Sequence, residues 1–116
     1  MNWSAESIGG VMVFGFGQTF KIDFESSPEF AETLKKGLAD GSQLLLDLNG
    51  VEYVDSRDLG ILVYGVNQVL ASGAEVKFFI PSETIREVFE VTHLNRVYDI
   101  FSDREKALNA FGIQSA

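Results

Sequence analysis

Residues 44–62 limit the possible folds of this chain more than any other segment. They open with an almost continuous apolar run, residues 44–48, which is typical of a strand covered on both faces. Asn49 and Gly50 then predict a turn. Asp55 and Ser56 precede apolar residues with helical spacing, so the segment predicts a buried strand, a short connection and an amphipathic helix. The apolar stripe of that helix comprises Leu59, Leu62, Val63, Val66 and Leu70.

The start of this helix is a candidate functional site. Ser56 stands where backbone N–H groups lack helical partners and where the helix dipole favours negative charge, so the position suits a phosphate. The same residues also fit an ordinary capped helix, in which Asp55 is the cap and Asp58 is its acidic counterpart three residues later. The residues alone leave both interpretations open.

Strand and helix patterns alternate along the rest of the chain. Residues 3–24 predict an opening β-hairpin, with the second strand near residues 11–16. Strands are expected at residues 43–48, 75–80 and 97–101. Helices are expected from the cap Ser27 to Gly41, from about Asp55 to Gly73, from the cap Ser82 onward, and over residues 103–111 after a capping box at residues 102–105. This alternation predicts a single α/β domain over residues 1–116, with its core in about residues 3–111.

Composition limits the classes of function. The chain has 116 residues, no cysteine and one histidine, so it can form no disulfide, thiolate metal site or cysteine nucleophile. Its formal net charge of −8 disfavours nucleic acids and anionic membrane surfaces as partners. No apolar run approaches the ~20 residues of a membrane span, and the N-terminus lacks a signal pattern. We therefore expect a cytoplasmic protein.

Enzyme chemistry finds little support in the sequence. Ser56, His93 and Asp99 form a triad on paper, but no G-x-S-x-G elbow surrounds the serine, and we expect His93 to finish the helix that begins at Ser82. Gly15-Phe16-Gly17 lacks the third glycine and the helix of a dinucleotide motif. The carboxylates are scattered, and a structural role as hydrogen-bond acceptor is expected for Asp47. We expect no catalysis, no cofactor and no metal.

The central segment resembles the STAS domain of bacterial anti-sigma factor antagonists. Members of that family carry a strand of the type LxLDLSxV and then a helix that opens D-S-S/T-G-L-G. Here residues 46–51 read Leu-Asp-Leu-Asn-Gly-Val, and residues 55–60 read Asp-Ser-Arg-Asp-Leu-Gly. Residues 88–94 are similar to the helix end L-x-x-T-G-L of the family. The resemblance covers roughly residues 40–111 in order and spacing.

The resemblance implies both a fold and a role. The fold is an α/β domain with a mixed, mostly parallel sheet, an N-terminal β-hairpin and about four helices. The role is that of a non-enzymatic module that binds an anti-sigma factor or a related serine-kinase-type ATPase domain. Sequestering that partner would free a sigma factor and so regulate transcription. The implied contact residues are Asp55, Ser56, Arg57, Asp58 and Leu59, together with the helix that follows.

The chain departs from the family pattern at the regulatory position. In the family, the second residue after the aspartate is the phosphorylated serine or threonine, and glycine follows it. Arg57 and Asp58 stand at these two positions. Arginine has no hydroxyl to phosphorylate, and Asp58 is expected to add a permanent negative charge beside it. The resemblance therefore implies that the usual switch is absent or altered. Ser56 is the candidate for a substitute phosphoacceptor, although this position is usually not phosphorylated in the family.

Two other functions stay open at this point. One is an accessory subunit of a lipid-transport or stress-signalling assembly, which an unusually apolar exposed helix face would favour. The other is a small hydrolase that uses Ser56. The oligomeric state is also open, a homodimer included.

Overall fold

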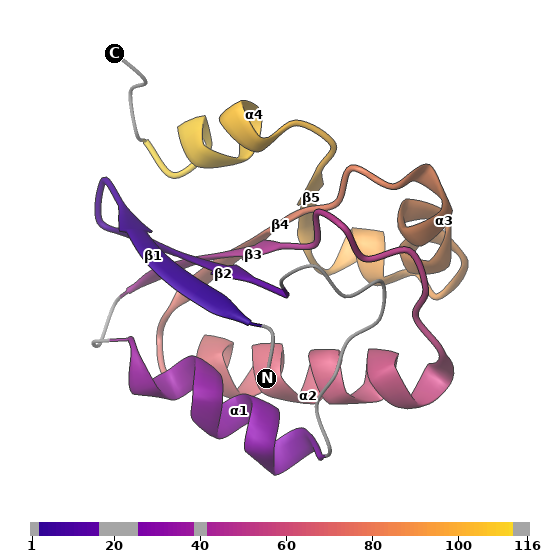
Figure 1. Ribbon diagram of the computed structural model, residues 1–116, viewed down its shortest axis with the longest axis horizontal. Helices are drawn as coiled ribbons and strands as arrows, with labels where there is room; N and C mark the ends of the chain where they lie inside the picture. Colours follow the sequence, from indigo (N-terminus) through magenta and orange to yellow (C-terminus); the bar gives the residue numbers. More distant parts are fainter. Residues whose placement is uncertain (1–2, 17–25, 39–41, 113–116) are drawn as a thin grey trace.

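The computed structural model describes residues 3–16, 26–38 and 42–112, which form an α/β domain around one sheet (Figure 1). The five strands lie in chain order, β1-β2-β3-β4-β5. They are β1 (Ser4–Ile8), β2 (Val11–Gly15), β3 (Gln43–Asp47), β4 (Glu75–Phe79) and β5 (Asp99–Phe101). β1 and β2 form an antiparallel hairpin, and β2 to β5 run parallel to one another. The predicted mixed, mostly parallel sheet with an N-terminal hairpin is confirmed.

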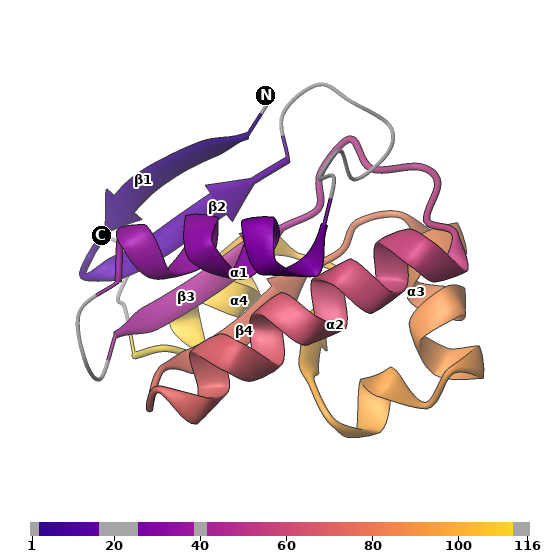
Figure 2. The ribbon, with the colours of Figure 1, turned by 90° about the horizontal axis from the view of Figure 1, so that it is seen from below.

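Helices cover both faces of this sheet. Within the described ranges they are α1 (Ser27–Lys36), α2 (Ser56–Ala71), α3 (Glu83–Val91), the short 3-10 helix η1 (Leu94–Arg96) and α4 (Arg104–Asn109). Figures 1 and 2 show α1 and α2 side by side on one face, with α4 on the opposite face. In both views α3 lies at one end of the molecule, close to the first turns of α2.

The side chains of β3 alternate between two hydrophobic cores. Leu44 and Leu46 belong to the larger core under α1, α2 and α3, whereas Leu45 belongs to the smaller core under α4. All three leucines are fully buried. A central parallel strand covered on both faces needs apolar residues at successive positions, which explains the unbroken leucine run.

Two predicted helix caps are wrong by one residue, and two are correct. The cap of α1 is Ser26 rather than Ser27, because the Ser26 hydroxyl accepts a hydrogen bond from the Glu29 backbone N–H at 3.2 Å. The cap of α4 is Asp103 rather than Ser102, because its carboxylate accepts from two backbone N–H groups of the first turn. Asp55 and Ser82 cap α2 and α3 as predicted.

Several predicted element ends also differ from the structure. Helix α1 ends at Lys36, and the predicted end, Gly41, lies outside the described residues. The last strand is shorter than residues 97–101, because the Val97 and Tyr98 backbone N–H groups donate to the Leu94 carbonyl and so close η1 instead of joining the sheet.

The apolar stripe of α2 is confirmed over its first three turns. Leu62 and Val66 are fully buried, and Leu59 and Val63 are partly buried against the same core. Leu70 is 38% exposed, and Val69 takes the buried position of the last turn instead. The buried face of α2 is centred on a row that includes Leu62, Val66 and Val69, so Leu70 lies beyond its edge. None of the helices in the described part of the chain is long and apolar enough to cross a membrane.

Candidate functional site at the start of helix α2

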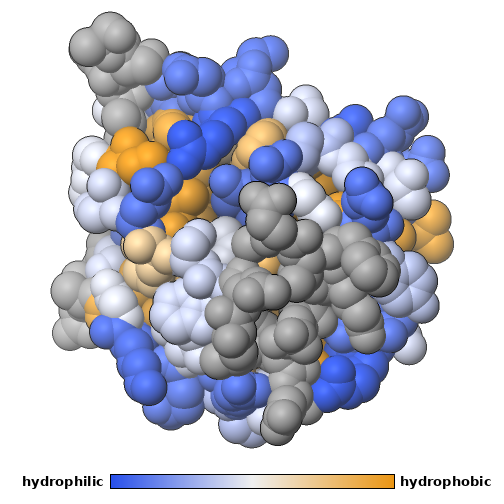
Figure 3. Space-filling view, viewed as in Figure 1, coloured by the Kyte–Doolittle hydropathy of each residue, from blue (hydrophilic) through white to orange (hydrophobic). Residues whose placement is uncertain are grey.

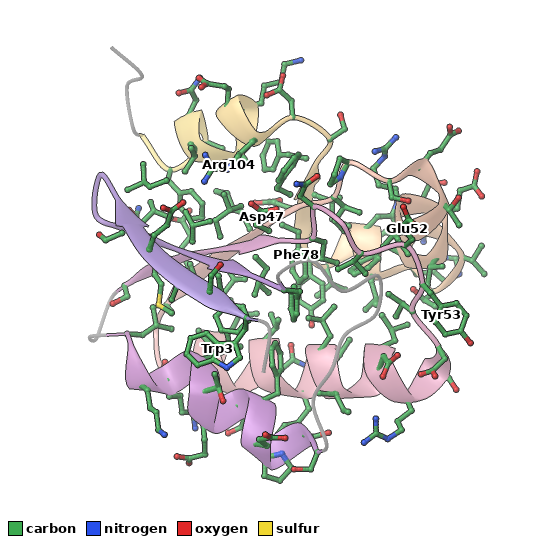
Figure 4. All side chains as sticks on the ribbon, in the orientation of Figure 1. Trp3, Asp47, Glu52, Tyr53, Phe78 and Arg104 are labelled. Carbon is green, nitrogen blue, oxygen red and sulfur yellow. The ribbon has the colours of Figure 1, made fainter. Side chains whose placement is uncertain are left out.

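The connection from β3 to α2 is fixed by Asp47. Its Oδ1 atom accepts a hydrogen bond from the Asn49 backbone N–H at 2.9 Å, and Gly50 follows with φ of 91°. Its Oδ2 atom lies 3.6 Å from Nε of Arg104, and Figure 4 shows the two side chains together between the sheet and α4. The expected structural role of Asp47 as hydrogen-bond acceptor is confirmed.

The cap of α2 is made by Asp55. Its Oδ1 atom accepts a hydrogen bond from the Asp58 backbone N–H at 2.8 Å, and its carbonyl accepts one from the Leu59 N–H at 2.9 Å. An acidic cap also interacts favourably with the positive end of the helix dipole. The part of the capped-helix interpretation that makes Asp55 the cap is therefore confirmed.

The five predicted site residues do not share one environment. Ser56 is exposed and the Arg57 side chain is 56% exposed, whereas Asp55 and Leu59 are half-buried. The Asp58 side chain is fully buried, and Nη1 of Arg57 lies 3.7 Å from its Oδ1 atom. The carboxylate of Asp58 thus lies beside Arg57, but it points inward from the first turn of α2. Ser56 and Arg57 are therefore the exposed polar residues at the start of α2.

A shallow hollow of about 330 Å³ lies beside Ser56. Its lining consists of Ser56, Leu59, Gly60 and Val63 from α2, with Thr92 and Leu94 from the far side. Below we call it the α2 hollow. Only Ser56 and Leu59 were predicted as site residues. The spacing of Gly60 and Val63 on the same helix is a signal that could have found them, whereas Thr92 and Leu94 arrive through the tertiary fold.

A second shallow hollow of about 330 Å³ continues from the first along α3. Thr84, Glu87, Val88, Val91 and Thr92 line it, so Thr92 belongs to both hollows. Below we call it the α3 hollow. Val91 is 79% exposed, an unusual environment for a valine. Figure 3 shows hydrophobic surface at the right edge of the molecule, where α3 lies in Figure 1.

Comparison with known proteins shows which family has this sequence and fold. The family model described as STAS domain matches residues 2–107. The chain belongs to the STAS domain family. A Thermotoga neapolitana protein described as an anti-sigma factor antagonist is 33% identical over 79 residues, which cover 68% of this chain and 67% of the relative. The anti-sigma-B factor antagonist of Bacillus subtilis is 32% identical over 85 residues, covering 73% and 78% respectively.

A solved structure is also similar. The anti-sigma factor antagonist (STAS) domain protein of Planctomyces limnophilus aligns with a TM-score of 0.81 over 97% of this chain and 100% of its own. Because the sequences are only 23% identical, this likeness establishes the shared fold. The sequence relatives assign the chain to the anti-sigma factor antagonist group of STAS domains.

Two residues of the considered catalytic triad, His93 and Asp99, have structural roles in this STAS domain. His93 follows the last turn of α3 in the left-handed conformation, with φ of 63°, and its N–H donates to the Glu90 carbonyl at 3.0 Å. The prediction that it finishes the helix begun at Ser82 is confirmed. Asp99 accepts a hydrogen bond from Nζ of Lys77 at 2.9 Å. Among the described residues, no group of three or more potential ligand side chains could hold a metal ion.

Proposed function

We propose that this STAS domain binds an anti-sigma factor, or a related serine-kinase-type ATPase domain, and keeps that partner from its sigma factor. The contact surface is the start of α2 with the adjoining α2 hollow. The observation that carries the proposal is that the exposed Ser56 lines an apolar hollow together with other residues of the same helix, and that the next residue, Arg57, is also exposed. Such a site supplies contact area and charge and needs no catalytic step. The protein would meet its partner in the cytoplasm.

We further propose that the phosphorylation switch of the family is disabled here. Arg57 occupies the acceptor position, and its guanidinium offers no hydroxyl to a kinase. Ser56 has a hydroxyl and is exposed, but successive helical residues point about 100° apart around the axis. A kinase site that fits residue 57 would therefore meet the Ser56 hydroxyl in the wrong direction. A phosphate would bring about −1.5 to −2 charges to this surface, and without one the surface stays competent to bind.

The test uses the purified anti-sigma factors of the organism that makes this chain, each assayed singly for binding and for phosphate transfer from ATP. Wild type should bind one of them equally well with and without ATP, and should take up no phosphate. The Arg57→Ser/Asp58→Gly double variant should take up phosphate and then bind more weakly. Arg57→Ser alone is the matched control that keeps the buried Asp58 carboxylate.

Two outcomes would contradict this proposal in different ways. If wild type binds none of the anti-sigma factors, the binding role is wrong. If wild type is labelled efficiently and Ser56→Ala is not, the switch is present and has merely moved by one residue.

A second function is favoured by one observation. The 79% exposure of Val91 provides the apolar exposed helix face that an accessory subunit of a lipid-transport or stress-signalling assembly would use. The same assay with the ATPase subunits of transporters from that organism distinguishes the two roles, because each predicts binding to a different class of protein.

A further inference from the structure

Gly60 has no packing reason to be glycine. It lies in the second turn of α2, and a Cβ built on it would meet no atom of the described residues within 4 Å. Glycine inside a helix costs roughly 0.5–1 kcal/mol of stability relative to alanine. Gly65 in the same helix differs, because there a Cβ would collide with Phe30. Glycine at position 60 therefore leaves an open place on the surface of α2, at a cost in the stability of the unbound protein.

The surroundings of Gly60 show what could approach it. Ser56, Leu59, Gly60 and Val63 stand at positions i, i+3, i+4 and i+7 of one helix. Four residues in this arrangement form the hole that receives one side chain of a second helix in knobs-into-holes packing. With glycine at one corner, the hole stays open to the helix backbone. Thr92 and Leu94 close its far side.

The α3 hollow extends this surface and gives it a charge. Glu83, Glu87 and Glu90 are all exposed on α3. The one cation of this helix, Arg86, donates hydrogen bonds to the Ile80 and Pro81 carbonyls at 2.9 and 2.8 Å. The apolar hollow around Val91 is therefore flanked by carboxylates.

From these observations we infer that the two hollows together receive one amphipathic helix of the partner, with an apolar stripe flanked by basic residues. One apolar side chain of that helix enters the hole at Gly60, and others cover Val88 and Val91. This is the helix-in-groove mode of recognition, with charge complementarity at its rim. The inference rests on the proposed function, and it adds the chemistry of the segment that the anti-sigma factor contributes.

Other occupants fit this surface less well. Both hollows are shallow, so a small molecule would leave much of its surface in water, whereas small-molecule sites bury most of their ligand. An anionic membrane is disfavoured by the acidic rim and by the net charge of −8. A second copy of this chain would bring the same acidic rim, and like charges would then face each other.

The experiment compares two pairs of variants in their affinity for the anti-sigma factor that wild type binds. Gly60→Leu fills the hole, and its control is Ala71→Leu, an exposed position in the last turn of α2 that lines neither hollow. Val91→Glu places a charge in the α3 hollow, and its control is Val97→Glu. Val97 is also an exposed valine, at 68%, but it lines neither hollow. Gly60→Leu and Val91→Glu should each weaken binding about tenfold or more, and the controls less than about twofold. Thermal unfolding of Gly60→Leu should show a fold at least as stable as wild type, because leucine favours helix.

A third arm tests the charge of the partner helix. Replacing Glu83, Glu87 and Glu90 with glutamine should weaken binding and reduce its dependence on salt, because exposed charge pairs are screened by ions. Unchanged affinity and salt dependence would overturn the basic character of the helix.

The remaining outcomes separate this inference from the proposed function. If wild type binds the anti-sigma factor and Gly60→Leu and Val91→Glu bind it equally well, the inference falls and the proposed function stands. Equal losses in the two control variants would also overturn it. If wild type binds no anti-sigma factor, both fall together. Self-association of wild type that Val91→Glu abolishes would assign the surface to a second copy of the chain, which contradicts the inference.

Discussion

Gly65 of α2 lies so close to the ring of Phe30 of α1 that a Cβ on the glycine would overlap the ring. Phe30 is fully buried and also packs edge-on against Phe14 of β2, with ring centroids 6.0 Å apart. The glycine therefore sets how near the two helices approach each other beneath the sheet. The candidate site lies at the start of the same helix, about two to three turns before this contact.

Replacing Gly65 with alanine should destabilise the protein by about 1–3 kcal/mol, since an added methyl group overpacks a filled core. Replacing Gly60 with alanine should instead stabilise it by roughly 0.5–1 kcal/mol, because that position is open and helical. Urea denaturation of both variants measures the two changes. Effects of the same sign would show that Phe30 can move aside and that the contact does not set the helix spacing.

His93 adopts a left-handed backbone conformation that favours glycine. His93→Gly should therefore raise the free energy of unfolding by about 1 kcal/mol. His93→Ala keeps the Cβ and should bring no such gain, which makes it the matched control. A gain in the alanine variant as large as in the glycine variant would point to the imidazole, rather than the backbone, as the source of strain.

Asp55→Ala should lower the free energy of unfolding by about 0.5–2 kcal/mol, because the Asp58 N–H loses its acceptor at the start of α2. Asp55→Asn keeps an oxygen in the same place and should be nearly neutral. The pair separates capping from binding. If Asp55→Asn folds like wild type yet fails to bind the partner, the carboxylate charge itself is recognised.

Stability should fall in alkaline solution because of two buried groups. Burial alone would lower the pKa of Lys77, but the hydrogen bonds and charges of Asp99 and Glu75 outweigh it and raise the pKa above the ordinary 10.5. Burial raises the pKa of Tyr98 above the ordinary 10.0. A group whose pKa is raised by folding stabilises the protein fully below its unfolded pKa and loses that contribution as the pH rises through its folded pKa. The loss should therefore begin near pH 10 and continue above 10.5.

Chemical denaturation between pH 8 and about pH 11.5 tests this expectation. Lys77→Met and Tyr98→Phe should each flatten the alkaline decline, whereas Lys35→Met, a change at an exposed lysine of α1, should leave it as in wild type. A decline of the same steepness in all four proteins would assign it to other groups.

The sequence could predict most of the framework. The leucine run of β3 and the helical spacing that follows it are strong local signals, so strand and helix were both placed correctly. The caps were harder to predict, because two adjacent residues at the start of a helix can both serve as its cap. The side chain that reaches the first N–H groups of the helix belongs to Ser26 rather than Ser27, and to Asp103 rather than Ser102.

Only those residues of the candidate site that lie close together in the sequence could be predicted. Asp55, Ser56 and Leu59 follow from the start of one helix. Thr92, which joins the two hollows, lies far along the chain and has no signal of its own. The inward direction of the Asp58 side chain depends on how α2 rotates against the sheet, and periodicity does not fix that rotation to within one residue.

The strand order of the sheet has a consequence for how the chain is made. Each strand pairs with the one synthesised just before it, from β1 to β5. A growing chain can therefore add one strand and one helix at a time to a surface that already exists, without waiting for a later segment to be inserted between finished ones. Domains emerge from the ribosome N-terminus first, and short-range pairings close fastest. In nascent chains that end after β4, we expect the backbone amides of β2 and β3 to be protected from hydrogen exchange already. Helix α4 should complete the second core last.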